Sequence, residues 1–183
     1  MIKVQSSLRS SGEMKLRTSS RFLAVGASAA AMVLAATGVG HADPADTPLA
    51  ATDLIINGSG SCLEIENSST ANGANAQQWT CVFQGGANWR IFQGGAPTEW
   101  WIINEKSGKC LEVENGWTHN GAPVQQWTCT YGVKHQLWFI DGNRIQNKAT
   151  GKYLEVENSS GANGARVQQW QYANVRGQHW TWG

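Results

Sequence analysis

Charged residues are scarce in this chain. Asp, Glu, Lys and Arg make up 15% of its 183 residues, and the formal net charge is +1. Five of the 14 Lys and Arg precede residue 43, which leaves nine of them against twelve Asp and Glu in the remainder, a net charge of −3. No basic patch remains in that part. We therefore expect neither nucleic acid nor a membrane surface as a partner.

Helical patterns are also lacking after residue 42. No segment of useful length repeats apolar residues at the three- and four-residue spacing of an amphipathic helix. Short apolar runs (LIIN, WWII, LWFI, LEVE) alternate with clusters of Asn, Gly and Ser, and all ten Trp lie in this part. Short strands joined by tight loops have this pattern, and so many aromatic rings can supply a core without helices. The sequence predicts an all-β domain.

The first 42 residues have a different composition. Five basic residues precede an apolar run at 22–39, and the small residues Gly40 and Ala42 follow it. This order is typical of a secretory signal peptide. A membrane anchor is the alternative, but Gly, Ser and Thr dilute a run that is barely long enough to span. We predict a signal peptide at 1–42, a short linker at 43–53 and a secreted, extracellular domain at 54–183.

One pattern of 20 residues occurs three times in the predicted domain. The copies are CLEIENSSTANGANAQQWTC (62–81), CLEVENGWTHNGAPVQQWTC (110–129) and YLEVENSSGANGARVQQWQY (153–172). Such a period indicates like supersecondary units that bury their apolar faces together. A propeller usually needs four or more blades, so three copies favour a β-trefoil. We predict three four-stranded repeats with pseudo-threefold symmetry, at about 54–99, 100–142 and 143–183.

The four cysteines lie at the ends of the first two copies. An oxidising destination and the repeat symmetry together predict disulfides between Cys62 and Cys81 and between Cys110 and Cys129. Tyr153 and Tyr172 are expected to pack together at the same place in copy three. A zinc site is the alternative, but separations of 19 residues are unlike zinc-ligand spacing. We expect no metal and no cofactor.

The repeats resemble the ricin B-chain type lectins and the related carbohydrate-binding modules of bacterial glycosidases. The resemblance covers residues 54–183. Its motifs are an opening Gly-Lys-Cys-Leu (108–111, with Gly-Lys-Tyr-Leu at 151–154), a central Asn-Gly and a closing Gln-x-Trp (136–138 and 178–180). Copy one lacks the closing glutamine, since Ala87 stands there. The resemblance implies that the closing tryptophans are core residues near the threefold axis.

The resemblance further implies a shallow sugar site on each repeat. An acidic residue in the opening strand accepts hydrogen bonds from sugar hydroxyls, an aromatic residue 15 positions later stacks on the sugar ring, and a glutamine two residues earlier assists. A carboxylate is a strong acceptor, and an indole covers the apolar face of a sugar. The implied carbohydrate-binding residues are Glu64, Gln77 and Trp79; Glu112, Asn120, Gln125 and Trp127; and Glu155, Gln168 and Trp170.

Each feature has a plainer alternative. Alternation in LEVE predicts that Leu111 and Val113 face the core while Glu112 and Glu114 face solvent. The glutamates could then be solvated or paired with Lys109 and Lys152, and the three tryptophans could belong to the core. Two further residues, Trp117 and His119, occur only in copy two. They are expected either to widen an aromatic wall at that site or to pack locally.

Two other functions are alternatives to carbohydrate binding. An enzyme is not expected, because carboxylates such as Glu112 and Glu114 on an exposed strand lack the burial that separates the pKa values of an acid and a base, and no nucleophile or phosphate-loop motif occurs. The alternative function is binding of a protein partner such as a hydrolase, as an inhibitor, through the least symmetric loop, 92–99. The sequence predicts a monomeric, non-catalytic protein that binds carbohydrate at up to three sites.

Overall fold

The computed structural model describes residues 53–183, and within them it has twelve strands. The predicted signal peptide and all but the last residue of the predicted linker lie outside the described residues. The strands are β1 (Asp53–Asn57), β2 (Cys62–Ile65), β3 (Ala76–Trp79), β4 (Asn88–Gln93), β5 (Trp100–Asn104), β6 (Cys110–Val113), β7 (Val124–Trp127), β8 (Trp138–Asp141), β9 (Arg144–Asn147), β10 (Tyr153–Val156), β11 (Val167–Trp170) and β12 (Trp180–Trp182). No helix in the described range is long and apolar enough to span a membrane.

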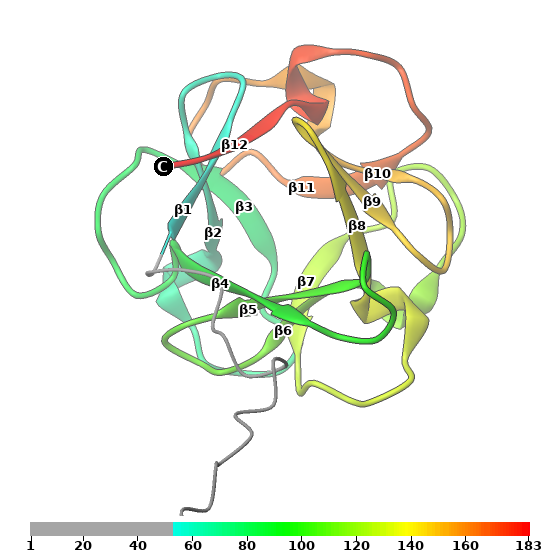
Figure 1. The fold of residues 1–183 in the computed structure, drawn as a ribbon. Coiled ribbons are helices and arrows are strands. Elements are labelled where there is room, and N and C mark those ends of the chain that lie inside the picture. Colours follow the sequence, from blue (N-terminus) through cyan, green and yellow to red (C-terminus); the bar gives the residue numbers. More distant parts are fainter. Residues whose placement is uncertain (1–52) are drawn as a thin grey trace, which may run out of the picture. The chain divides into compact units, whose positions relative to one another are not determined.

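The strands form three successive groups of four, arranged around a common centre (Figure 1). In each group the second and third strands form a hairpin: β2 with β3, β6 with β7 and β10 with β11. The first and fourth strands of the groups join in the order β9-β8-β5-β4-β1-β12. The predicted β-trefoil of three four-stranded repeats is confirmed.

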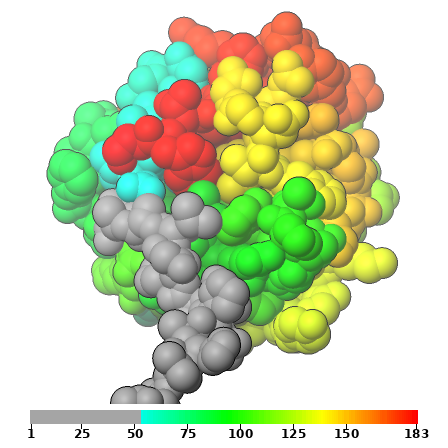
Figure 2. All heavy atoms as spheres, in the orientation of Figure 1, coloured from blue at the N-terminus to red at the C-terminus, as the bar shows by residue number. Residues whose placement is uncertain are grey.

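The two ends of the described chain meet. β1 pairs antiparallel with β12 through Ile55 and Trp182. The space-filling view shows the cyan residues of β1 in contact with the red C-terminal residues (Figure 2). The backbone N–H of Trp180 also donates to the carbonyl of Asn143, 2.9 Å away, just before β9. The six strands therefore form a ring, and the three hairpins project from it.

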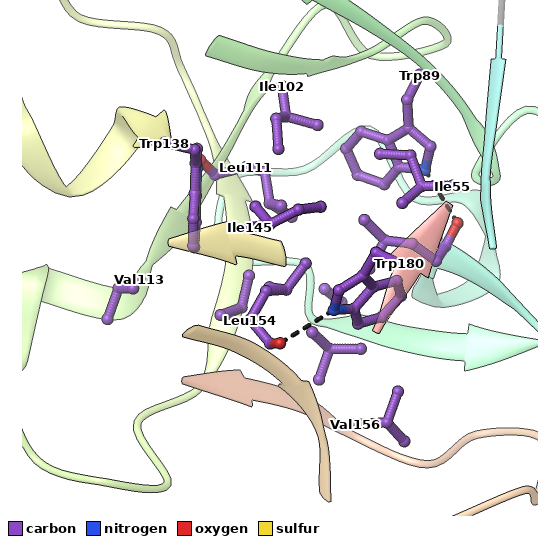
Figure 3. Packing of buried hydrophobic residues seen from close by; sticks show 14 of the residues in the cluster. Ile55, Trp89, Ile102, Leu111, Val113, Trp138, Ile145, Leu154, Val156 and Trp180 are labelled. Carbon is purple, nitrogen blue, oxygen red and sulfur yellow. Dashed lines mark hydrogen bonds between the residues drawn. The ribbon is translucent and has the colours of Figure 1, made fainter. Parts of the chain in front are cut away.

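The closing tryptophans form the centre of the core, as expected. Trp89, Trp138 and Trp180 have exposed fractions of 0%, 0% and 1% and belong to one apolar cluster (Figure 3). Each indole N–H donates to the carbonyl of the leucine in the opening strand of its own copy. The acceptors are Leu63 at 2.9 Å, Leu111 at 2.9 Å and Leu154 at 3.0 Å. These bonds satisfy the one polar atom of each buried ring.

Both predicted disulfides are present. Cys62 bonds to Cys81 and Cys110 to Cys129, and no free cysteine remains among the described residues. The zinc alternative for these cysteines is therefore wrong. In copy three the rings of Tyr153 and Tyr172 pack with centroids 5.2 Å apart. The guanidinium of Arg144 lies 4.6 Å from the centroid of the Tyr172 ring. An aromatic contact with a cation–π contact thus replaces the covalent bond.

The second glutamine of each Gln-Gln-Trp motif joins one copy to the next. Gln126 is fully buried, and its amide donates to the carbonyls of Ser69 (2.8 Å) and Ala71 (2.9 Å) in copy one. Its side-chain oxygen accepts a bond from the hydroxyl of Ser107 (2.7 Å). Gln169 binds the loop of copy two and Gln78 the loop of copy three in the same way. The loop of every copy is therefore held by the hairpin of its neighbour.

Candidate functional site

A hollow lies beside each hairpin, and the three hollows are built from matching positions. Each contains the glutamate of the opening strand, the asparagine three residues after that glutamate, the first glutamine of Gln-Gln-Trp and the tryptophan. Hollow one is lined by Glu64, Asn67, Ser68, Gln77, Trp79 and Gln84; hollow two by Glu112, Asn115, Gln125, Trp127, Thr130, Val133, His135 and Gln136; hollow three by Glu155, Asn158, Ser159, Gln168, Trp170, Ala173 and Val175. Their volumes are about 300, 370 and 330 Å³ in that order.

The carboxylate of hollow two is held by two amides. Gln125 Nε2 donates to Glu112 Oε1 at 2.8 Å, and Gln136 Nε2 donates to Glu112 Oε2 at 2.7 Å. Glu112 is only 3% exposed. Hydrogen bonds to both oxygens fix the plane of the carboxylate, and its remaining lone pairs are acceptors of fixed direction. The glutamate is therefore a positioned acceptor at the base of the hollow.

Copies one and three hold their carboxylates in the same manner. In copy three, Gln168 and Gln178 donate to the two oxygens of Glu155 at 3.2 and 2.7 Å. In copy one, Gln77 donates to Glu64 at 3.2 Å, and Gln84 donates to the other oxygen. Burial raises the pKa of the Glu64 and Glu155 carboxyl groups, and the glutamine hydrogen bonds offset part of this rise.

The prediction that the glutamates of Leu-Glu-x-Glu face solvent is wrong for the first glutamate of each copy. Glu64, Glu112 and Glu155 are 3%, 3% and 5% exposed. They do lie on the opposite side of the strand from the core leucines. The loop between the tryptophan of the hollow and the closing tryptophan folds back over that side, however, and supplies the second amide. The alternation of residues along a strand predicts on which side of the strand a side chain lies, but it does not reveal whether a loop covers that side. Among the ion pairs of residues 53–183, neither Lys109 nor Lys152 pairs with a glutamate.

The tryptophans of the hollows lie at the surface, so the core alternative is wrong for them. Trp79 and Trp127 are 38% and 42% exposed, and Trp170 is half-buried. The loop of the neighbouring copy supports each ring at a glycine. A Cβ atom added to Gly121 would lie 3.6 Å from Trp170 Cζ3, and Gly121 has φ +82°, a left-handed conformation that favours glycine. Gly73 and Gly164 lie beside Trp127 and Trp79 in the same way.

Asn120 is separated from the other residues predicted for copy two. Its side-chain oxygen accepts a hydrogen bond from the backbone N–H of Gln171 in copy three, at 3.0 Å, and it does not line hollow two. Asn72 and Asn163 make the equivalent bonds to Thr128 (3.0 Å) and Thr80 (2.8 Å). The structure therefore brings together Glu112, Gln125 and Trp127, while the central Asn-Gly joins one copy to the next.

Several lining residues were not predicted as site residues. Asn67, Asn115 and Asn158 each follow the second glutamate of the Leu-Glu-x-Glu-Asn pattern and have positive φ angles of 56°, 51° and 54°. Asparagine tolerates this conformation better than most residues. Its recurrence at the same position in all three copies is the feature of the sequence that could have indicated a place in the site. The closing glutamines Gln136 and Gln178 were recognised as a motif but not as partners of the glutamates. Gln84 has no equivalent glutamine at its position in the other copies, so the repeat pattern does not indicate its role.

Hollow two has one further titratable group. His135 lines it, and its Nε2 lies 3.5 Å from Glu112 Oε2. Gly86 and Gly177 occupy the corresponding position, immediately before that of the closing glutamine, in the other copies. No group of His, Cys, Asp and Glu in the described part of the chain is arranged to hold a metal ion.

Trp117 and His119 form a separate aromatic pair. Their ring centroids are 5.6 Å apart, and Trp117 is 42% exposed. Neither residue lines hollow two. Their backbone carbonyls accept hydrogen bonds from the Gln169 amide of copy three. The pair therefore belongs to the contact between copies two and three, and the wider aromatic wall expected within hollow two is not formed.

The repeated fold and the repeated hollow define a β-trefoil with one equivalent hollow on each repeat. The chain matches the ricin-type beta-trefoil lectin domain-like family in three overlapping segments, residues 52–127, 87–170 and 134–182. It belongs to this family.

Solved structures with the same fold include natural and designed proteins. The designed threefold symmetric protein ThreeFoil is 33% identical, with a TM-score of 0.68 over 71% of this chain and 96% of that one. The exo-β-1,3-galactanase 1,3Gal43A from Clostridium thermocellum is 27% identical, with a TM-score of 0.67 over 74% of this chain but only 31% of the galactanase. The C-half of an earthworm R-type lectin, solved with GalNAc, is 17% identical, with a TM-score of 0.60 over 72% and 98% of the two chains, and shows likeness of fold alone. No curated protein matches the chain.

Proposed function

We propose that this protein binds carbohydrate without catalysis, through up to three pseudo-equivalent shallow sites. The observation that carries this proposal is the pairing, in each hollow, of a buried carboxylate fixed by two amides with a surface indole. The carboxylate accepts hydrogen bonds from sugar hydroxyls, and the directions of its free lone pairs select their stereochemistry. The indole covers the apolar C–H face of the same sugar ring. Membership of the ricin-type beta-trefoil lectin domain-like family supports the same function.

Three weak sites on one domain favour a clustered or polymeric ligand. When one site is occupied, a second sugar of the same glycan is held near the next site at a high effective concentration. The avidity of the whole domain then exceeds the affinity of a single hollow. We therefore propose a polysaccharide or a densely glycosylated surface as the ligand, rather than a free monosaccharide.

The absence of a second carboxylate in each hollow supports a non-catalytic role. Hollows one, two and three contain Glu64, Glu112 and Glu155, and no other acidic residue among 53–183 lines them. Glycoside hydrolysis ordinarily uses two carboxyl groups that flank the scissile bond. Glu114, which would be the second carboxylate of such a pair, begins the short 3-10 helix Glu114–Gly116 and does not line hollow two.

We also propose that the protein is secreted and acts as a monomer. The two disulfides suit an extracellular location, and the N-terminal sequence has the order of a signal peptide. Carbohydrate is the proposed partner, and nucleic acid, membrane, metal and cofactor have no place in the proposal.

Binding of a protein partner through residues 92–99 is the weaker candidate. Phe92 and Gln93 belong to β4, and the following residues make a short connection in which the Gly94 N–H donates to the Glu99 carbonyl at 2.9 Å. The carboxylate of Glu99 pairs with Lys148. This connection is a short turn closed by its own hydrogen bond and paired with Lys148 through Glu99, whereas an inhibitory loop must project from the scaffold into its partner.

The proposed function is tested on a glycan array. The purified protein is compared with a triple variant, Trp79→Ala, Trp127→Ala and Trp170→Ala, and with Trp117→Ala as a control that removes an exposed tryptophan outside the hollows. Circular dichroism verifies that each variant is folded. Binding by the parent and the control, lost in a folded triple variant, supports the proposal. A folded parent that binds no glycan contradicts it.

A further inference from the structure

Two aromatic rings stand almost free of the protein. Phe83 and Tyr131 are each 85% exposed, more than any other large hydrophobic side chain in the described residues. Each lies two residues after the second cysteine of its copy, on the loop between the tryptophan of the hollow and the closing tryptophan. Copy three has Asn174 at the same offset from Tyr172. The feature is therefore present in two copies and missing from the third.

Both residues are next in sequence to residues that line a hollow. Phe83 immediately precedes Gln84, which lines hollow one and holds the Glu64 carboxylate. Tyr131 immediately follows Thr130 and comes two residues before Val133, and both of these line hollow two. The loop between the tryptophan of the hollow and the closing tryptophan is one residue longer in copy two than in copies one and three. Two loops of different length thus each carry an exposed aromatic residue beside a residue that lines the hollow.

Packing within the domain does not account for these rings. At 85% exposure each leaves both faces largely in water, and neither takes part in an aromatic pair within residues 53–183. A single exposed hydrophobic residue needs no special explanation. Two such rings form a pattern, however, because each is next in sequence to a lining residue of a hollow that already contains an indole and a carboxylate. An aromatic side chain also loses little conformational entropy when a ligand covers it, because it has only two side-chain torsions.

We propose that Phe83 and Tyr131 form a second sugar subsite at hollows one and two. This subsite takes the sugar residue next to the one that stacks on Trp79 or Trp127. The inference rests on the proposed carbohydrate function and specifies its ligand: copies one and two recognise at least two linked sugar residues, whereas copy three recognises one. The three sites then differ in the length of glycan that they read, although each contains the same glutamate, first glutamine and tryptophan.

The test isolates one hollow at a time in the full-length protein. Trp79→Ala with Trp170→Ala leaves hollow two, and Trp79→Ala with Trp127→Ala leaves hollow three. Calorimetric titrations use matched mono-, di- and trisaccharides of galactose, glucose, mannose and xylose. In the hollow-two background, Tyr131→Ala should weaken trisaccharide binding roughly threefold to tenfold, the range for one aromatic contact. Monosaccharide affinity should change by less than about twofold.

Two controls make the result specific. Phe92→Ala removes another exposed phenylalanine, on β4 and outside the lining of every hollow, and should change neither affinity. In the hollow-three background, disaccharides and trisaccharides should bind no better than the monosaccharide. Equal losses for all chain lengths in Tyr131→Ala, or no loss at all, would overturn the inference while leaving the proposed function intact. A folded parent that binds no sugar of any length overturns the proposed function, and the second subsite with it.

Discussion

Gln84 donates a hydrogen bond to the carboxylate of Glu64 from a position three residues before the one where the other copies have their closing glutamine. Ala87 occupies that position in copy one, and Gln136 and Gln178 occupy it in copies two and three. The second amide of hollow one is therefore supplied by a different part of the loop. Copy one has lost the motif but has kept the support of its carboxylate.

Replacing Gln84 should consequently weaken hollow one. Gln84→Ala removes one of two amides from the buried carboxylate, which then turns more freely and is harder to keep ionised. Because hydrogen bonds to charged groups contribute about 1.5–3 kcal/mol, sugar affinity at hollow one should fall by roughly tenfold or more. The measurement is a titration in a Trp127→Ala, Trp170→Ala background. Gln93→Ala, a glutamine on β4 that lines no hollow, is the control; an equal loss in both variants would refute the role of Gln84.

The two adjacent glutamines of copy two should have separate effects. Gln125→Ala removes a hydrogen bond from Glu112 and should weaken sugar binding at hollow two, with a smaller loss of stability than Gln126→Ala because Gln136 still donates to the carboxylate. Gln126→Ala leaves the carbonyls of Ser69 and Ala71 without their donor and should lower the free energy of unfolding by roughly 2–4 kcal/mol. Urea denaturation and sugar titration of both variants measure the two effects. Similar stability in the two variants would contradict the division of roles.

Binding at hollows one and three should depend on pH. Burial raises the pKa of the Glu64 and Glu155 carboxyl groups. Acidification therefore protonates these acceptors at a pH above the ordinary carboxyl range, roughly 4 to 4.5. Sugar affinity at either hollow should fall as the pH decreases through the raised pKa. Titrations between pH 7 and pH 4.5 measure this change, and a constant affinity across the whole range would show that the carboxylate is not the acceptor.

The same two carboxyl groups should affect stability with the opposite trend. Because their pKa is raised in the folded state, the folded protein holds more protons than the unfolded chain above the ordinary carboxyl range. Their contribution to stability is complete below the unfolded pKa and is lost as the pH rises through the folded pKa. The free energy of unfolding of the parent should therefore decrease with rising pH relative to a Glu64→Gln, Glu155→Gln variant. A parallel pair of pH profiles would contradict this linkage.

The bridge of copy one and the tyrosine pair of copy three should differ in strength. Replacing Cys62 and Cys81 by alanine should lower the free energy of unfolding by about 3 kcal/mol, as expected for a loop of this length. Tyr172→Ala removes an aromatic contact and a cation–π contact and should cost about 1–2 kcal/mol. Guanidinium denaturation measures both. A larger loss for Tyr172→Ala would contradict the idea that the tyrosine pair is the weaker of the two.

Much of the fold follows from sequence arithmetic. Three copies of one pattern lead to the trefoil, and the position of the cysteines within the copies leads to the two disulfides. The closing tryptophans Trp138 and Trp180 follow from a motif that the family shares. These inferences succeed because each depends on a signal that the chain repeats, and repetition fixes which residues are equivalent.

The site was less predictable because its contacts cross between segments. The burial of Glu112 depends on the loop that carries Gln136, 24 residues later. The position of Asn120 depends on Gln171 of the next copy, 51 residues away. Gln84 has no equivalent at its own position in the other copies, so no pattern within one strand or one repeat reveals its role. Only the packing of loops against hairpins determines these partners.

The central claim is that sugar rings stack on Trp79, Trp127 and Trp170. The most direct measurement is the indole N–H region of a two-dimensional ¹H–¹⁵N NMR spectrum during titration with a glycan that binds on the array. Three single Trp→Phe variants at these positions assign the signals. The account predicts that the signals of these three residues shift in proportion to occupancy while those of the buried Trp89, Trp138 and Trp180 stay in place. Saturation with ligand that leaves all three surface signals unmoved would contradict it.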